Sequence, residues 1–267
     1  MEKIVSKSFW HKYADRYQSI RSLVCVGLDS DLTKLPDFVH SSPNPIWEFN
    51  RAIIDATHEY AGAYKPNLAF YLADGTRGLE ALYLTVKHIP QEIPIILDCK
   101  VGDIGSTMAG YATAFFKDLA VDAITINPLM GKDVMAPLLE IEHSFAFALA
   151  LTSNPSAQDF FHNAEMKQKL SQWINEFEPE RLGAVVGATQ TQDLALMRKL
   201  LPSQIFLIPG VGAQGGDLQA VLNNAIFSKD EPRILINSSR GIIFASKGKD
   251  FAAKAAEATK ELYQACL

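Results

Sequence analysis

The sequence predicts an α/β protein built as a single (β/α)₈ barrel, the TIM-barrel fold. Eight short apolar runs recur along its 267 residues, and each ends in polar or glycine residues, as expected of buried parallel strands. Segments with helical periodicity separate these runs, so strand and helix alternate. Eight such units in about 250 residues match this barrel, whereas a doubly wound sheet usually has fewer strands.

The expected elements follow in order from the N-terminus of one domain that spans residues 1–267. Residues 1–22 precede the first apolar run and are expected to form an N-terminal helical extension. Helical periodicity marks residues 45–60, 133–142 and 191–201, and the long span 160–182 is expected to hold an extra helix. The strands are expected near residues 23–29, 62–67, 94–100, 123–128, 147–154, 183–189, 205–212 and 233–240.

Composition and charge exclude several classes of partner. The formal net charge of −5 provides no basic footprint for nucleic acid or an anionic membrane, so neither is expected. No stretch has the length of a transmembrane span, and the charged N-terminus lacks the apolar region of a signal peptide. The three cysteines, Cys25, Cys99 and Cys266, show no C-x-x-C spacing and are expected to be reduced. A cytoplasmic location is therefore expected.

The third strand ends in the element Asp98-x-Lys100-x-x-Asp103. Side chains alternate along a strand, so Asp98 and Lys100 share a face. At the mouth of a buried sheet, mutual charge and desolvation perturb the pKa values of such a pair, as in catalytic sites. Taken alone, the pair could equally be a structural ion pair at a strand end.

Other strand ends carry a matching set of polar groups. In this fold the carboxyl ends of the strands carry the chemistry. Asp29 ends the first strand, Lys65 lies at the end of the second, and Ser153 follows the fifth. Any one of these groups could be a solvated strand-end residue, but their joint occurrence favours a site.

The last two strands predict a binding site for phosphate. The seventh runs into PGVGAQGGD, where glycines allow backbone N–H groups to approach an anion closely. The eighth ends in NSSRG, where Arg240 could hold a phosphate with a bidentate guanidinium. Alone, these features would be a turn and a surface arginine. Loops after these two strands are the usual phosphate site of the fold, so a phosphorylated small molecule is the expected ligand.

The sequence lacks the motifs of several other kinds of enzyme. None of the six histidines falls at a predicted strand end, and no Cys/His cluster occurs, so neither a metal nor a histidine base is expected. The chain has no G-x-S-x-G element and no dinucleotide fingerprint after the first strand. Lysine is left as the acid or base.

Together, D-x-K-x-x-D-I, K-P-N, LTSNP, PGVGAQGGD and NSSRG resemble the orotidine 5′-phosphate decarboxylase family, in its longer bacterial branch. The resemblance runs in order from Leu23 to Gly241. Related metal-dependent sugar-phosphate enzymes share the D-x-K-x-x-D element but carry an acidic residue at the end of the second strand. Lys65 at that position would repel a divalent ion, so the resemblance implies an enzyme without a metal or other cofactor.

The resemblance also implies roles for individual residues and a homodimer with shared active sites. Lys65, Asp98 and Lys100 would form a catalytic charge network, completed by Asp103 from the neighbouring subunit. Loss of CO₂ from orotidine 5′-phosphate would leave a C6 carbanion, which Lys100 would protonate to give uridine 5′-phosphate in de novo pyrimidine biosynthesis. The implied substrate-binding residues are Asp29, Ile104, Thr107, Ser153, Gly212, Gln214, Arg240 and Gly241, with Ile104 and Thr107 serving the partner's pocket.

Three alternatives remain open. A metal-dependent sugar-phosphate decarboxylase would share the barrel, and so would an aldolase with Lys65 or Lys100 as a Schiff base. A non-catalytic barrel that binds a phosphometabolite is the third. Binding alone does not require two aspartates beside a substrate carboxylate, which disfavours this last alternative.

Overall fold

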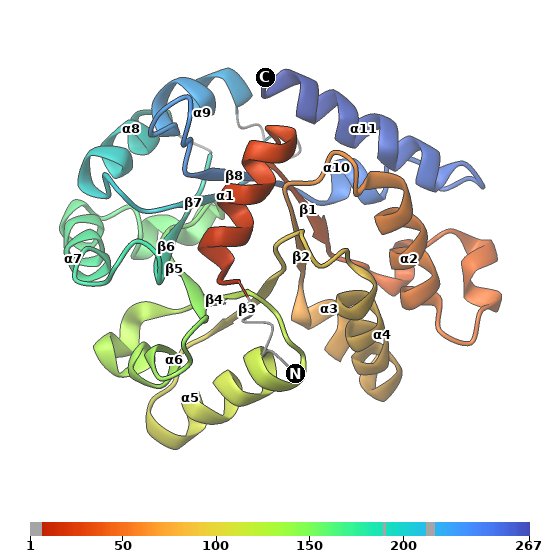
Figure 1. The fold of residues 1–267 in the computed structure, drawn as a ribbon, viewed down its shortest axis with the longest axis horizontal. Helices are drawn as coiled ribbons and strands as arrows, with labels where there is room; N and C mark the ends of the chain where they lie inside the picture. Colours follow the sequence, from red (N-terminus) through yellow and green to blue (C-terminus); the bar gives the residue numbers. More distant parts are fainter. Residues whose placement is uncertain (1–6, 189–190, 212–216) are drawn as a thin grey trace.

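A barrel of eight strands with helices around it forms the molecule (Figure 1). The structure is a computed structural model, and it describes residues 7–188, 191–211 and 217–267. The strands are β1 (Val24–Leu28), β2 (Ala63–Pro66), β3 (Ile96–Val101), β4 (Ala123–Ile126), β5 (Phe145–Leu151), β6 (Leu182–Val186), β7 (Phe206–Pro209) and β8 (Ile234–Ser238).

The strands form one parallel sheet in the order β2-β1-β8-β7-β6-β5-β4-β3. Its two edges meet, because the isolated bridges Tyr64 to Ile95 and Asn67 to Asp98 join β2 to β3. The predicted TIM-barrel fold is therefore confirmed. All carboxyl ends of the strands lie at one end of the barrel, which places the predicted strand-end residues on a common face.

Helices connect the strands on the outside. The α-helices are α1 (Phe9–Ile20), α2 (Pro45–Thr57), α3 (Leu68–Leu72), α4 (Gly75–His88), α5 (Gly105–Ala112), α6 (Ala136–Leu139), α7 (Ala164–Ile174), α8 (Thr191–Leu200), α9 (Leu218–Ala225), α10 (Arg240–Ile243) and α11 (Phe251–Ala265). Shorter 3₁₀ segments are η1 (Leu32–Lys34), η2 (Asp37–Ser41), η4 (Pro128–Val134) and η5 (Pro155–Asp159), and the π-helical η3 (Thr113–Asp118) continues α5. None of the helices in the described ranges is long and apolar enough to cross a membrane.

Local sequence explains where α2 begins and which face it buries. The side chain of Asn44 accepts a hydrogen bond from the N–H of Trp47, and Pro45 occupies the first helical position. Phe49 and Ile53, four residues apart, are fully buried on one face. The expected helix over residues 45–60 thus forms, and it ends three residues early.

The expected continuous helix over residues 133–142 is wrong. Residues 128–134 form the 3₁₀ segment η4, and α6 spans only Ala136–Leu139. Pro137 explains the break, because proline has no N–H to donate and fits only in the first turn of a helix. The expected extra helices are present as α1 in the N-terminal extension and α7 within residues 160–182.

Helix α1 covers the amino-terminal end of the barrel. Its Phe9 is fully buried, with its ring centroid 4.6 Å from that of Phe145 and 5.3 Å from that of Phe147. Tyr13 donates a hydrogen bond to the carbonyl of Ile234 and accepts one from its N–H. Figure 1 shows α1 lying across the barrel strands. The bottom of the barrel is therefore filled, and a ligand must enter from the carboxyl ends.

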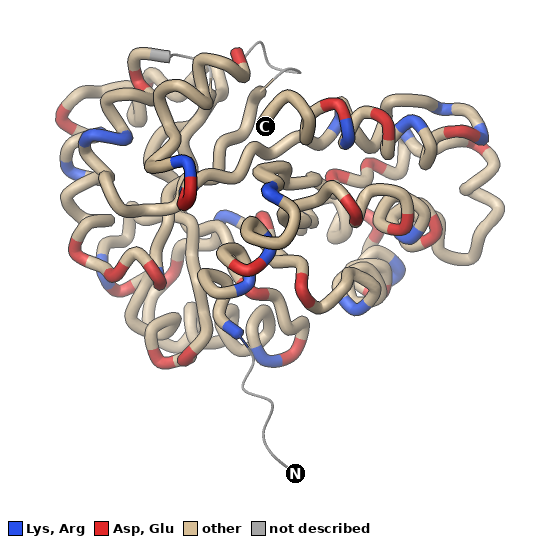
Figure 2. Tube along the Cα trace, turned by 45° about the horizontal axis from the view of Figure 1, so that its top comes forward, with Lys and Arg blue, Asp and Glu red and all other residues tan. Residues whose placement is uncertain are grey.

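Acidic and basic residues are interspersed along the outer segments (Figure 2). This pattern fits the modest net charge of the sequence. Any site for an anion must therefore come from a few charges placed locally.

Candidate active site

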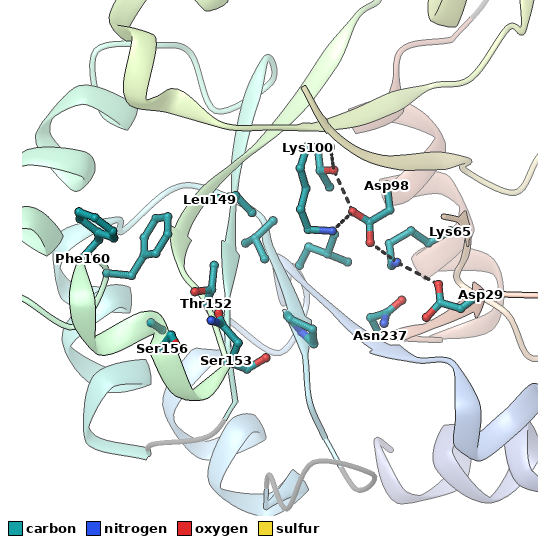
Figure 3. A pocket seen from close by; sticks show the side chains of 17 residues that line it. Asp29, Lys65, Asp98, Lys100, Leu149, Thr152, Ser153, Ser156, Phe160 and Asn237 are labelled. Carbon is teal, nitrogen blue, oxygen red and sulfur yellow. Dashed lines mark hydrogen bonds and ion pairs between the residues drawn. The ribbon is translucent and has the colours of Figure 1, made fainter. Parts of the chain in front are cut away.

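A cavity of about 490 Å³ opens at the carboxyl ends of the strands. Figure 3 shows charged side chains on one side of it and hydroxyl and aromatic side chains on the other. Four predicted residues of the charged side, Asp29, Lys65, Asp98 and Lys100, line it together with Ser153. Residues far apart in the sequence thus meet because their strands are neighbours in the barrel.

Asp98 is the centre of the charged side. Its Oδ2 lies 2.7 Å from Nζ of Lys65, and its Oδ1 lies 2.5 Å from Nζ of Lys100. Lys65 also lies 3.9 Å from Oδ1 of Asp29. The signs of the charges alternate along this row, so each charge has an opposite neighbour (Figure 3).

Burial and charge act in opposite directions on the pKa values of this network. Burial alone would lower the pKa of Lys65, which is 4% exposed, but the carboxylates of Asp98 and Asp29 outweigh it and raise that pKa. Burial alone would raise the pKa of Asp98, but Lys65 and Lys100 outweigh it and hold that pKa well below its usual range. Both groups are therefore charged at neutral pH.

Lys100 reaches the cavity from an unusual backbone. Its φ is +48°, in the left-handed region that few residues other than glycine adopt. Its side chain is half exposed, in contrast to the buried Lys65. Lys100 is thus the ammonium of the network that a ligand in the cavity can reach most easily.

A second cavity of about 310 Å³ adjoins the first, since Asp29, Pro209 and Asn237 line both. Arg240 and Lys34 bring positive charge to it. Arg240 was expected within the last strand, but β8 ends at Ser238 and Arg240 begins α10. Ser239, with φ −112° and ψ −85°, ends the extended backbone and turns the chain into that helix.

The remaining predicted residues fall into three groups. Gly212 and Gln214 lie outside the described residues. Gly241 follows Arg240 in α10, and Asp103, Ile104 and Thr107 lie after β3. All four are absent from the described lining of both cavities. The chain therefore brings Lys65, Asp98, Lys100 and Arg240 to one face of the barrel, whereas Asp103, the fourth member of the predicted charge network, lies outside the described lining of both cavities.

Several lining residues are not predicted from the sequence. Thr125 is the one hydroxyl in the apolar run of β4, and strand alternation is the signal that points it away from Ile124 and Ile126. Asn237 lies three residues before Arg240, and its buried Oδ1 has no hydrogen-bond partner among the described residues. Phe160 comes from the long span before β6, where no motif indicates its position.

The arrangement can bind an anion and transfer a proton. A half-exposed ammonium beside a cavity stabilises negative charge that develops on a ligand and can donate a proton to it. The described residues contain no group of three or more His, Cys, Asp or Glu side chains that could hold a metal ion.

The sequence matches the family described as "Orotidine 5'-phosphate decarboxylase / HUMPS family" over residues 22–256. It is 46% identical to an orotidine 5'-phosphate decarboxylase of Christiangramia forsetii, with 87% of this chain and 88% of that one covered. It is 42% identical to the protein of the same name from Bacteroides fragilis, with 91% and 92% covered.

Solved structures of similarly named proteins superpose on this chain. A putative orotidine-monophosphate-decarboxylase from Toxoplasma gondii superposes with a TM-score of 0.84 at 32% identity, over 98% of each chain. The UMP synthase of Leishmania donovani superposes with a TM-score of 0.82 at 36% identity, over 97% of this chain and 56% of that one.

Proposed function

The chain belongs to the orotidine 5′-phosphate decarboxylase / HUMPS family, and from this we propose that it converts orotidine 5′-phosphate to uridine 5′-phosphate and CO₂ in de novo pyrimidine biosynthesis. The observation that carries the proposal is the row Asp29, Lys65, Asp98 and Lys100 at the cavity. This row suits a reaction that removes a carboxylate, because a fixed ammonium stabilises the carbanion that develops and can protonate it.

The two cavities suit the two ends of such a substrate. The phosphate would bind in the smaller cavity beside Arg240, and the pyrimidine would lie in the larger one beside Ser153. From the resemblance to the family, Gly212, Gln214 and Gly241 would complete the phosphate and base contacts. Asp29 lines both cavities, which suits a contact with the ribose between them.

In the proposed reaction, the bond between C6 and the carboxylate breaks, and its electron pair stays on C6 while CO₂ leaves. The ammonium of Lys100 attracts this pair and then transfers a proton to C6. This attraction is stronger in the transition state than in the ground state, so it accelerates the reaction. Water returns the proton to Lys100 after the product leaves.

Asp98 would face the substrate carboxylate and repel it. Two charges about 4 Å apart repel by about 4 kcal/mol at an effective dielectric constant of about 20. Relief of that repulsion corresponds to about a thousandfold in rate. Stabilisation of the carbanion by a preorganised ammonium and binding of the distant phosphate must supply the rest.

Lys65 favours this chemistry over the other reactions of related barrels. Its ammonium lies 2.7 Å from Asp98, where a divalent ion held by that carboxylate would meet a positive charge. A Schiff base requires a neutral amine, and the raised pKa of Lys65 opposes its formation there. The proposed enzyme therefore works without a metal or other cofactor.

We also propose a homodimer in which Asp103, Ile104 and Thr107 complete the partner's site. Exposed apolar side chains support it: Ile104 precedes α5 and is 47% exposed, and Met130 of η4, which packs against α5, is 56% exposed. Exposed apolar residues that gather on one face are typical of an interaction surface. The cytoplasm stays the proposed location.

The test is to incubate the purified protein with orotidine 5′-phosphate in excess EDTA. Pyrimidine absorbance should change as substrate is consumed, and NMR should identify uridine 5′-phosphate as the product. Borohydride should trap no covalent adduct. Turnover that requires a divalent ion, or a trapped lysine adduct, would favour one of the alternative enzymes, and binding without turnover would favour a binding protein.

A further inference from the structure

Thr125 on β4 contacts the catalytic segment of β3 through its hydroxyl group. The residue is 1% exposed. Its Oγ1 accepts hydrogen bonds from the N–H of Cys99, at 3.0 Å, and of Lys100, at 2.9 Å. The same hydroxyl donates to Oδ1 of Asp98, at 3.0 Å. One hydroxyl thus contacts three consecutive residues of the segment.

These bonds lie where the pairing between the two strands is interrupted. Leu97 pairs with Ile124 and Val101 pairs with Ile126, so four residue steps on β3 face two on β4. The N–H groups of Cys99 and Lys100 lie within this bulge, and the hydroxyl of Thr125 accepts from both. The hydroxyl of Thr125 thus takes the place of the backbone carbonyl groups that accept hydrogen bonds elsewhere in the sheet.

The bulge is also where Lys100 has its positive φ of +48°. A lysine adopts this left-handed backbone only where the surroundings hold it there. Its N–H bond to Thr125 is one such contact, and the bond from its Nζ to Oδ1 of Asp98 is another. Thr125 therefore contacts both the backbone of the proposed proton donor and the carboxylate that its ammonium touches.

The direction of the third hydrogen bond follows from the first two. A hydroxyl oxygen has two lone pairs and one hydrogen. Both lone pairs accept N–H groups here, so the hydrogen is left for Asp98. Asp98 must accept this bond, as an ionised carboxylate does. The same hydroxyl therefore favours the charged form of Asp98.

We propose that Thr125 is a positioning residue of this site: its hydroxyl holds Lys100 in the left-handed conformation and Asp98 in place, so that the Lys100 ammonium meets C6 of the substrate. The inference rests on the proposed decarboxylase function. It predicts that loss of the hydroxyl slows the chemical step and leaves substrate binding nearly unchanged, because Thr125 lines the larger cavity and Arg240 lines the adjoining one.

The test compares Thr125→Val, which keeps the shape and removes the hydroxyl, with Thr125→Ser, which keeps the hydroxyl. Single-turnover decarboxylation should be about 100-fold slower in Thr125→Val, as expected for a misplaced catalytic group, with KM changed about threefold at most. Thr125→Ser should stay within about threefold of the wild type. Thr259→Val is the matched control, because Thr259 is also fully buried and donates its hydroxyl to Ala255 far from the cavities.

A purely structural role would lower the melting temperature of Thr125→Val and Thr259→Val alike without a selective loss in the chemical step. Equal loss in Thr125→Ser and Thr125→Val, or an unchanged chemical step in Thr125→Val, would overturn the inference. If Thr125→Val does not fold, Thr125→Ala makes the same comparison with Thr125→Ser.

A crystal structure of the hydroxyl-free variant provides a readout that does not depend on activity. The inference predicts that Lys100 leaves the positive φ region or that its Nζ moves away from Asp98. An unchanged segment from Asp98 to Val101 would contradict it. An inactive wild-type protein would count against the proposed function but not against the role of Thr125 in positioning the segment, because the crystal structures test that role without an activity measurement.

Discussion

Asp98 shares its two carboxylate oxygens between Lys65 and Lys100, and this sharing sets the charge state of the site. Lys65 is buried and keeps the carboxylate of Asp98 ionised, whereas Lys100 is half exposed at the cavity. The sequence predicts all three residues, because each is a charged residue near the carboxyl end of a predicted strand. It does not predict Thr125, because a threonine inside an apolar run resembles ordinary strand composition until the bulge of β3 is known.

The pKa shifts predict how the Lys65 and Asp98 pair depends on pH. The lowered pKa of Asp98 means that its stabilisation is present above the unfolded value of about 3.9 and is lost as the pH falls through the folded pKa. The raised pKa of Lys65 means that its stabilisation is present below about 10.4 and is lost as the pH rises through the folded pKa. The contribution of the pair to the free energy of unfolding should therefore be constant between about pH 5 and pH 9.

Urea unfolding of the wild type and Lys65→Met at several pH values measures this contribution. The difference in free energy of unfolding should be constant from pH 5 to 9 and shrink in acid. Lys34→Met, which removes an exposed partner of Asp31, is the control and should change stability little. A Lys65→Met difference that is the same at pH 3 and pH 7 would contradict the assigned shifts.

Arg240→Ala tests the phosphate contact. Loss of a charge-assisted contact of about 1.5 to 3 kcal/mol should raise KM about 10- to 100-fold, with a smaller effect on kcat. Steady-state kinetics measures both. Arg77→Ala, which removes an exposed arginine paired with Asp74, should leave KM unchanged. An unchanged KM in Arg240→Ala would exclude Arg240 from the phosphate site.

At the scale of elements, predicted strands and observed strands coincide because buried parallel strands are continuous apolar runs bounded by polar residues. The predicted and observed ends of a strand differ where a residue adopts a backbone conformation that ends the extended chain. The seventh strand, expected to reach residue 212, ends at Pro209, since Gly210 has a φ of +96°. The helical periodicity over residues 133–142 predicts one continuous helix, but the chain forms η4 and the short α6 there, because Pro137 cannot lie in the interior of a helix.

Helix α1 gives a prediction about stability. Phe9→Ala removes a fully buried ring that packs on Phe145 and Phe147, so it should destabilise the protein by about 3 to 5 kcal/mol. Urea unfolding measures this loss. Phe38→Ala, at a residue that is 43% exposed, is the control with a smaller expected effect. A loss below about 1 kcal/mol for Phe9→Ala would show that α1 does not stabilise the barrel.

On the scale of the whole molecule, the barrel brings eight strand ends to one face and so creates two adjoining cavities. The sequence predicts this convergence because the fold itself places strand ends together. It does not predict that Asn237 of β8 and Phe160 of the segment before α7 line the larger cavity, because their positions depend on long-range packing. The Asp103 segment lies outside the described lining of both cavities of its own chain, which suits a role in a second subunit.

Subunit mixing tests that role. Asp103→Ala and Lys100→Ala should each be inactive alone. In a symmetric dimer with shared sites, each heterodimer would have one intact site, so an equal mixture should recover about a quarter of wild-type activity. Mass spectrometry of differently labelled subunits verifies the exchange. Exchange without recovery would mean that each site is built from one chain.

The most direct test of the central claim is the rate of CO₂ release from orotidine 5′-phosphate in EDTA, measured side by side for the wild type and Lys100→Ala. A metal-free site in which Lys100 stabilises and protonates the carbanion predicts undiminished wild-type turnover and only a small residual rate in the variant, with the fold retained by circular dichroism. Substantial turnover by Lys100→Ala, or loss of wild-type turnover in EDTA, would contradict it.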